Sequence, residues 1–115
     1  MITVEVSGLR LFGRHGVHPH EKEQGQDFVF DVELDVGDRG SSDRLEDAVD
    51  YRAVASTVQA VSDARSYDLI EALATAVARE LLERYAAERV RVRVAKPAVR
   101  PGGLDGTAAV SVLLP

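Results

Sequence analysis

Hydrophobic and polar residues alternate in the first third of the chain, with the period of two that is typical of β-strands with one buried face. The alternation covers residues 2–6, breaks at Gly8, and resumes over residues 9–12 shifted by one position, which predicts a β-bulge. The clearest alternation covers residues 28–36. The polar segment 13–26 between these strands is longer than a tight hairpin needs, and such loops tend to be functional.

Two helices are expected after these strands. Valines recur at helical spacing over residues 54–61, behind Asp50, which is a typical N-cap residue. A longer apolar stripe covers residues 70–81. Asp68 and Glu71 have the spacing of a capping box for this second helix.

Alternations over residues 90–94 and 110–114 close the chain, joined by a Pro- and Gly-rich loop over residues 96–103. The order strand, strand, helix, helix, strand, strand predicts an α+β fold, with a four-stranded antiparallel sheet and both helices on one face. On the other face, we expect an acidic row of one strand to pair with a basic row of another. These rows are Asp31, Glu33 and Asp35, and Arg89, Arg91 and Arg93.

The length and the absence of repeats or linkers indicate a single domain over residues 1–115. One sheet in so small a chain leaves two open edges, which proteins rarely leave uncovered. We therefore expect a homo-oligomer assembled through those edges.

The composition narrows the function classes. A net charge of −5 without a basic block argues against binding to nucleic acid. The absence of cysteine excludes disulfides, thiolate metal sites and cysteine nucleophiles. No apolar run has membrane-spanning length, and no basic segment precedes a hydrophobic one at the N-terminus, so we expect a cytoplasmic protein without membrane contact.

Three histidines, His15, His18 and His20, lie close together in the loop after the first strand. Imidazoles at such spacing can bind zinc, although no helical His-x-x-x-His pair or carboxylate partner accompanies them. An ordinary polar surface loop is the simpler interpretation, and we predict no metal.

Lys96 is notable because the chain has only two lysines against twelve arginines. Arginine keeps its proton, whereas a lysine amine can act as acid or base. Lys96 ends a strand and opens a Pro/Gly loop, where a side chain can project into a cleft; a solvated strand-end lysine is the alternative.

Carboxylates and one tyrosine are weaker candidates. Glu71, in the first turn of the second helix, is explained by capping alone, but it could also offer two acceptor oxygens to a ligand edge with two donors. Tyr51, after Asp50, and Glu21, in the long loop, could equally be packing and surface residues.

Five segments occur in a specific order. They are GLRLFGRHGV over residues 8–17, EKEQGQDF over 21–28, DAVDY over 47–51, LIE over 69–71 and VRVAKP over 92–97. Together they make the chain resemble the dihydroneopterin aldolase family over essentially its whole length.

The resemblance implies an enzyme without metal or cofactor that cleaves a small pterin, 7,8-dihydroneopterin, to 6-hydroxymethyl-7,8-dihydropterin and glycolaldehyde in folate biosynthesis. It also implies the tunnelling fold, whose sheets join in rings. A tetrameric ring, or an octamer of two stacked rings, would then hold sites between its subunits.

The resemblance further assigns substrate-binding roles. Glu71 would accept hydrogen bonds from the amidine-like edge of the pterin, and backbone groups of Ile70 and Val49 would contact the same ring. Tyr51 would lie against the pterin from a neighbouring subunit.

The implied catalytic residues are Lys96, Tyr51 and Glu21. Lys96 would be the general acid and base, Tyr51 would assist proton transfer, and Glu21 would place the substrate hydroxyls and the lysine. One departure is the loop over residues 97–105, which is one residue shorter than the family pattern and has Leu104 where the family has an aromatic residue.

Three other functions stay open. An epimerase could act on dihydroneopterin or its triphosphate, and a triphosphate would require basic residues such as Arg14 or Arg100. A non-catalytic pterin- or purine-binding module would need only Glu71 and Tyr51. A zinc-dependent relative would depend on the three histidines.

Overall fold

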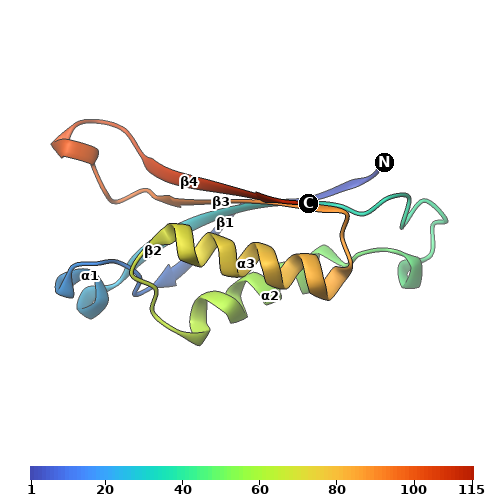
Figure 1. Cartoon of the computed structure of the whole chain (residues 1–115), viewed down its shortest axis with the longest axis horizontal. Coiled ribbons are helices and arrows are strands. Elements are labelled where there is room, and N and C mark those ends of the chain that lie inside the picture. Colours follow the sequence, from blue (N-terminus) through green and yellow to red (C-terminus); the bar gives the residue numbers. More distant parts are fainter.

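The computed structural model describes all residues 1–115 as a single sheet with helices on one face (Figure 1). The strands are β1 (Thr3–Gly13), β2 (Gln26–Asp35), β3 (Arg89–Lys96) and β4 (Ala108–Leu114), antiparallel and in that order across the sheet. The helices are α1 (Pro19–Gln24), α2 (Tyr51–Ala64) and α3 (Ile70–Tyr85), with short 3₁₀ turns η1 (Leu45–Asp47) and η2 (Pro101–Gly103). The predicted α+β fold is confirmed.

The register of the sheet confirms two details of the sequence pattern. Pairing of β1 with β2 shifts between Val6 and Leu9, and Gly8 there has φ of +67°, a conformation that favours glycine. Across β2 and β3, the acidic row faces the basic row, with ion pairs of 3.6 Å from Arg93 to Asp31 and 3.4 Å from Arg91 to Glu33. Because these pairs are exposed, each stabilises the fold by less than about 1 kcal/mol.

The core lies between the sheet and the two long helices. β2 contributes its apolar row from Phe28 to Leu34, Val36 directly after the strand extends this row, and β3 contributes Val90, Val92 and Val94. The helices contribute the stripes expected from their spacing, with Val54 and Val58 on α2. The buried residues of α3 are Ile70, Leu73, Ala74, Val77, Ala78 and Leu81. Burial of these side chains holds the first turn of α3 against the end of the sheet.

Of the two helix caps predicted from the sequence, the structure contains one. Asp50 caps α2 as predicted, because its side chain accepts a hydrogen bond from the backbone N–H of Arg52 at 2.9 Å. The predicted capping box of α3 is wrong: its N-cap is Leu69, with no side-chain cap. Asp68 lies one residue too early, and its carboxylate instead pairs with Lys22 at 2.7 Å.

The long loop after β1 contains α1, which hydrophobic periodicity did not predict. Six residues are too few to show a helical stripe, and none of them is buried. The signal that it did carry is Pro19 in the first turn, where proline is favoured. None of the helices has the length and apolar character that spanning a membrane requires.

Candidate active site

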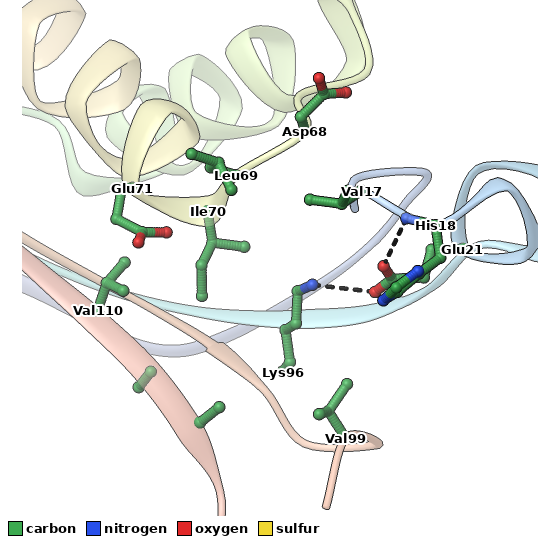
Figure 2. Close-up of a pocket in the computed structure, with 12 residues that line it drawn as sticks. Val17, His18, Glu21, Asp68, Leu69, Ile70, Glu71, Lys96, Val99 and Val110 are labelled. Atoms are coloured by element: carbon green, nitrogen blue, oxygen red, sulfur yellow. Dashed lines mark hydrogen bonds and ion pairs between the residues drawn. The ribbon is translucent and has the colours of Figure 1, made fainter. Parts of the chain in front are cut away.

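A cavity of about 410 Å³ opens where the start of α3, the end of β3, the start of β4 and the segment entering α1 meet. Figure 2 shows Glu71 on one side of this cavity, Lys96 toward the middle, and Glu21 with His18 on the other side. Four of the predicted site residues, Glu21, Ile70, Glu71 and Lys96, therefore meet in one pocket. Its apolar walls come from Val17, Leu69, Ile70, Val99, Ala108, Ala109 and Val110.

The central polar feature is an ion pair between residues far apart in the sequence. Lys96, the last residue of β3, donates from Nζ to Glu21 Oε2 at 3.0 Å. The two side chains are only 16% and 10% exposed. A largely buried ammonium next to a carboxylate suits proton transfer, because both groups are held in place and shielded from bulk water.

The Glu21 carboxylate is held by more than the lysine. Its Oε1 accepts from the backbone N–H of His18 at 3.2 Å, and its Oε2 accepts from Gln26 Nε2 at 3.3 Å. Burial raises the pKa of Glu21, but the hydrogen bonds from Lys96, His18 and Gln26 and the charge of Lys96 outweigh burial, so the net pKa is lowered. Glu21 is therefore a fixed anion beside Lys96 at neutral pH.

Gly16 provides the space for this carboxylate. A Cβ atom built at Gly16 would lie 2.4 Å from Glu21 Cδ, and Gly16 has φ of +150°, which side-chain-bearing residues rarely adopt. Gly16 therefore has a steric role in placing Glu21.

Glu71 presents a different kind of carboxylate. It lies in the first turn of α3, and its side-chain oxygens make no hydrogen bond or ion pair with the protein. In Figure 2 the carboxylate lies at the opposite end of the pocket from Glu21. Two free acceptor oxygens beside the buried Ile70 match a flat ligand edge with two N–H donors.

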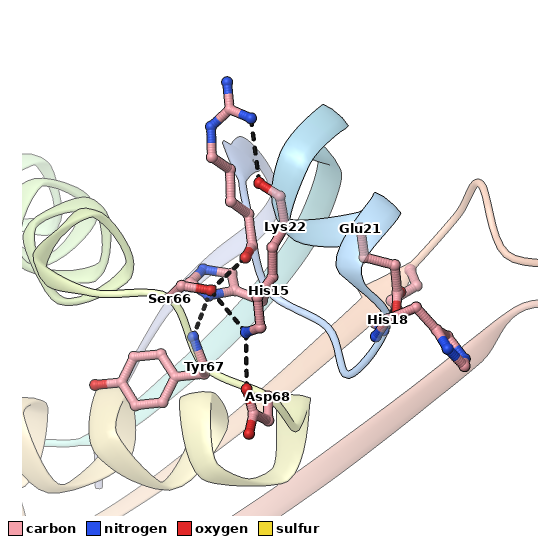
Figure 3. A network of polar contacts seen from close by, with 9 residues as sticks. His15, His18, Glu21, Lys22, Ser66, Tyr67 and Asp68 are labelled. Atoms are coloured by element: carbon pink, nitrogen blue, oxygen red, sulfur yellow. Dashed lines mark hydrogen bonds and ion pairs between the residues drawn. The ribbon is translucent and has the colours of Figure 1, made fainter.

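A polar network ties the two walls of the pocket together (Figure 3). Lys22 Nζ donates to Ser66 Oγ at 3.0 Å and pairs with Asp68, which joins α1 to the turn before α3. In the same region the backbone N–H of Gly16 donates to the carbonyl of Tyr67 at 2.9 Å. The carboxylates of Glu21, in α1, and Glu71, at the start of α3, are thus held at a set separation.

The three histidines do not gather around a metal position, and no group of three potential metal ligands occurs in the structure. His15 is buried: its Nδ1 accepts from the N–H of Tyr67 at 3.0 Å, so its Nε2 carries the hydrogen toward Ser62 Oγ, also at 3.0 Å. Burial lowers the pKa of His15, and the charges of Lys22 and Lys96 lower it further. His15 therefore has a structural role, while His18 and His20 stack on each other near the pocket.

Two predicted residues lie outside the pocket of their own chain. Val49 is buried in the core, and Tyr51, the first residue of α2, is 63% exposed. Neither lines the cavity. Within one chain, the site therefore lacks the tyrosine that the family resemblance places there from a neighbouring subunit.

The side chains that line the pocket carry more negative than positive charge. It contains three carboxylates, of Glu21, Asp68 and Glu71, and a single cationic side chain, Lys96. The two arginines considered for phosphate binding are engaged elsewhere. Arg14 donates to the carbonyls of Lys22 and Glu23, and Arg100 pairs with Asp105 at 2.6 Å.

Sequence reasoning missed the apolar walls and the network behind them. Val17, Val99 and the start of β4 have no chemical signature, and only the fold brings them together. Lys22 did carry a signal, because it is the second of only two lysines.

Comparison with known proteins gives a consistent result. The family model described as dihydroneopterin aldolase matches residues 4–113. The dihydroneopterin aldolase of Streptomyces coelicolor is 38% identical over 99 residues, which cover 84% of this chain and 83% of that protein. That of Methylorubrum extorquens is 38% identical over 107 residues, covering 90% and 82%.

Solved structures agree with these relatives. The E. coli dihydroneopterin aldolase in complex with neopterin matches with a TM-score of 0.89 and 28% identity, covering 100% of both chains. A Burkholderia dihydroneopterin aldolase bound to guanine matches with a TM-score of 0.83 and 25% identity, covering 98% of this chain and 89% of the other. A Bacillus uricase, 13% identical with a TM-score of 0.63 over 96% of this chain and 42% of its own, shares the fold alone.

Proposed function

This chain belongs to the dihydroneopterin aldolase family, and we propose that Lys96, Glu21 and Glu71 perform the reaction of that family in the pocket at the start of α3. The activity is that of a dihydroneopterin aldolase in folate biosynthesis: 7,8-dihydroneopterin is cleaved to 6-hydroxymethyl-7,8-dihydropterin and glycolaldehyde. The observation that carries the assignment of residues is the largely buried Lys96–Glu21 pair in the same pocket as the unpartnered Glu71 carboxylate.

Glu71 anchors the heterocycle. A pterin presents a ring N–H and an exocyclic amino group side by side, and guanine presents the same edge. The carboxylate of Glu71 accepts both hydrogen bonds, and the buried Ile70 presents backbone groups to the ring. The neopterin and guanine complexes of the E. coli and Burkholderia relatives support this ligand class.

The chemistry needs only one mobile proton. In 7,8-dihydroneopterin a C=N bond of the ring adjoins the side chain and accepts electrons when the bond between the first and second side-chain carbons breaks. Removal of the proton from the second hydroxyl turns that carbon into the aldehyde of glycolaldehyde. The electron pair of the broken bond forms an enamine with the ring.

Lys96 takes up the hydroxyl proton, directly or through a water molecule, and then returns a proton to the first side-chain carbon of the enamine. A general acid and base must change protonation state within one cycle, which lysine can do and arginine cannot. Glu21 accepts a hydrogen bond from Lys96 Nζ at 3.0 Å and holds the amine toward the side chain of the substrate. This role favours catalysis over a module that only binds pterins.

The free pterin is the better substrate for this pocket. A triphosphate at the Lys96 end would meet the Glu21 carboxylate, while neither Arg14 nor Arg100 lines the cavity. Charge repulsion of this kind disfavours a polyanion more than a neutral side chain.

A second copy of the chain completes the site. The exposed Tyr51 lies outside its own pocket, and β1 and β4 leave two open sheet edges through which rings can form. We infer that Tyr51 of one subunit covers the pterin held by another, in a tetrameric ring or an octamer. A cytoplasmic location stays a prediction.

Incubation with 7,8-dihydroneopterin, followed by chromatographic separation of the hydroxymethyl product from the epimer, tests the reaction. The hydroxymethyl product should accumulate with one equivalent of glycolaldehyde. Accumulation of the epimer alone would contradict the aldolase assignment and favour the epimerase.

Mixing two inactive variants tests the shared site. Lys96→Ala and Tyr51→Phe subunits, unfolded and refolded together, should regain part of the wild-type rate, because some interfaces then combine an intact Lys96 with an intact Tyr51. If each variant refolded alone is inactive and the mixture is too, Tyr51 does not act across subunits.

A further inference from the structure

The side chain of His18 lines the active pocket, yet the reaction described above does not use it. His18 is the residue before α1, and in Figure 2 its imidazole lies beside Glu21, at the end of the pocket opposite Glu71. Its backbone N–H supports Glu21, and no side-chain hydrogen bond from His18 caps α1. An imidazole with a free donor and a free acceptor thus faces the pocket.

The local structure holds this ring in place. Pro19 follows His18 and restricts its backbone to extended conformations, in agreement with φ of −78° and ψ of 141°. The ring of His20 stacks on that of His18, with centroids 5.5 Å apart and planes inclined by 10°. The stacked partner limits the rotation of an otherwise exposed ring and so reduces the conformational freedom that it loses on binding a ligand.

The order of groups along the pocket indicates what His18 would meet. With the pterin ring at Glu71, the three-carbon side chain of the substrate extends toward Lys96 and Glu21. Its first two carbons are the reacting ones and belong beside Lys96. The third carbon and its hydroxyl then lie farthest from Glu71, which is where His18 lies.

We propose that the imidazole of His18 hydrogen-bonds the terminal hydroxyl of the pterin side chain and makes the enzyme specific for a trihydroxypropyl substituent. This inference rests on the proposed function. The terminal hydroxyl does not react and leaves unchanged as part of glycolaldehyde, so His18 is a specificity residue and takes no part in proton transfer. Its loss therefore raises KM more than it lowers kcat.

A substrate pair that differs only in this group isolates the contact. One substrate is 7,8-dihydroneopterin, and the other is the analogue of the same configuration whose terminal CH₂OH is CH₃. Both give the same hydroxymethyl product, so one chromatographic assay measures both. Wild type should prefer the hydroxylated substrate by about three- to tenfold in kcat/KM, the contribution of one neutral hydrogen bond.

In His18→Leu this preference should disappear, because kcat/KM falls for the hydroxylated substrate and changes little for the analogue. His18→Gln, which keeps a donor and an acceptor, should retain part of the preference. Glu23→Leu, on α1 outside the pocket, controls for an added leucine on this helix and should retain all of it.

The outcomes separate this inference from the proposed function. If wild type cleaves neither substrate, the proposed function fails. If wild type cleaves both, and His18→Leu keeps the full preference or loses rate equally on both substrates, the role of His18 is refuted while the aldolase assignment stands.

Discussion

Replacing Lys96 by arginine separates two properties that the lysine combines, a positive charge and a transferable proton. The ion pair to Glu21 is 3.0 Å long and its side chains are 16% and 10% exposed, so a guanidinium can still pair there. Because arginine does not release its proton, Lys96→Arg should lose acid–base catalysis. We expect kcat to fall by about 10²- to 10⁴-fold, or about 2.7 to 5.4 kcal/mol of transition-state stabilisation.

Stability should follow a different order from activity. In Lys96→Ala the Glu21 carboxylate keeps the donors from His18 and Gln26, so the loss is that of one hydrogen bond to a charged group, about 1.5 to 3 kcal/mol. That is less than the total stability of about 5 to 15 kcal/mol of a typical domain, so the variant should fold. Lys96→Arg should have a free energy of unfolding closer to that of wild type.

The assay is product formation at saturating 7,8-dihydroneopterin, with neopterin affinity by calorimetry and the free energy of unfolding in urea. Both variants should bind neopterin, because Glu71 is intact, and both should be nearly inactive. An arginine variant with the wild-type kcat would refute the reasoning, since a fixed charge would then be sufficient.

Three further outcomes follow from the site and its supports. Glu71→Gln should weaken neopterin binding by about 10- to 100-fold, through loss of hydrogen bonds to a charged acceptor, and unchanged affinity in calorimetry would remove its anchoring role. Burial lowers the pKa of His15 below 6.5, so as the pH decreases the unfolded chain takes up a proton at this residue before the folded chain does. The contribution of His15 to the free energy of unfolding should therefore be fully present above pH 6.5 and decrease below it. This decrease, measured by unfolding in urea, should be smaller in His15→Gln. Gly16→Ala should displace Glu21 from Lys96 and lower kcat by about a hundredfold with the fold retained in circular dichroism; a wild-type rate would show that Glu21 tolerates the shift.

Much of the fold could be predicted because its information is local. The period-two rows of β2 and β3, the helical stripes of α2 and α3, and the phase shift at Gly8 each lie within one segment, and all are found in the structure. The helix α1 was missed because its six residues include no buried apolar side chain and therefore carry no periodic signal. Asp68 was misassigned because capping spacing alone does not reveal a competing partner such as Lys22.

The features of the site also divide into those that the sequence indicated and those that only the tertiary structure revealed. The rarity of lysine, the order of the sequence segments and the position of Glu71 in a helix turn identified its candidates from the sequence by itself. The family resemblance implied that Glu21 places the lysine, but only the tertiary structure gave the direct contact across 75 positions. The tertiary structure alone also decided that His15 is buried and that His18 lines the pocket. The physical reason is range: periodicity and capping act over a few residues, whereas a pocket depends on which distant segments the packed sheet and helices bring into contact.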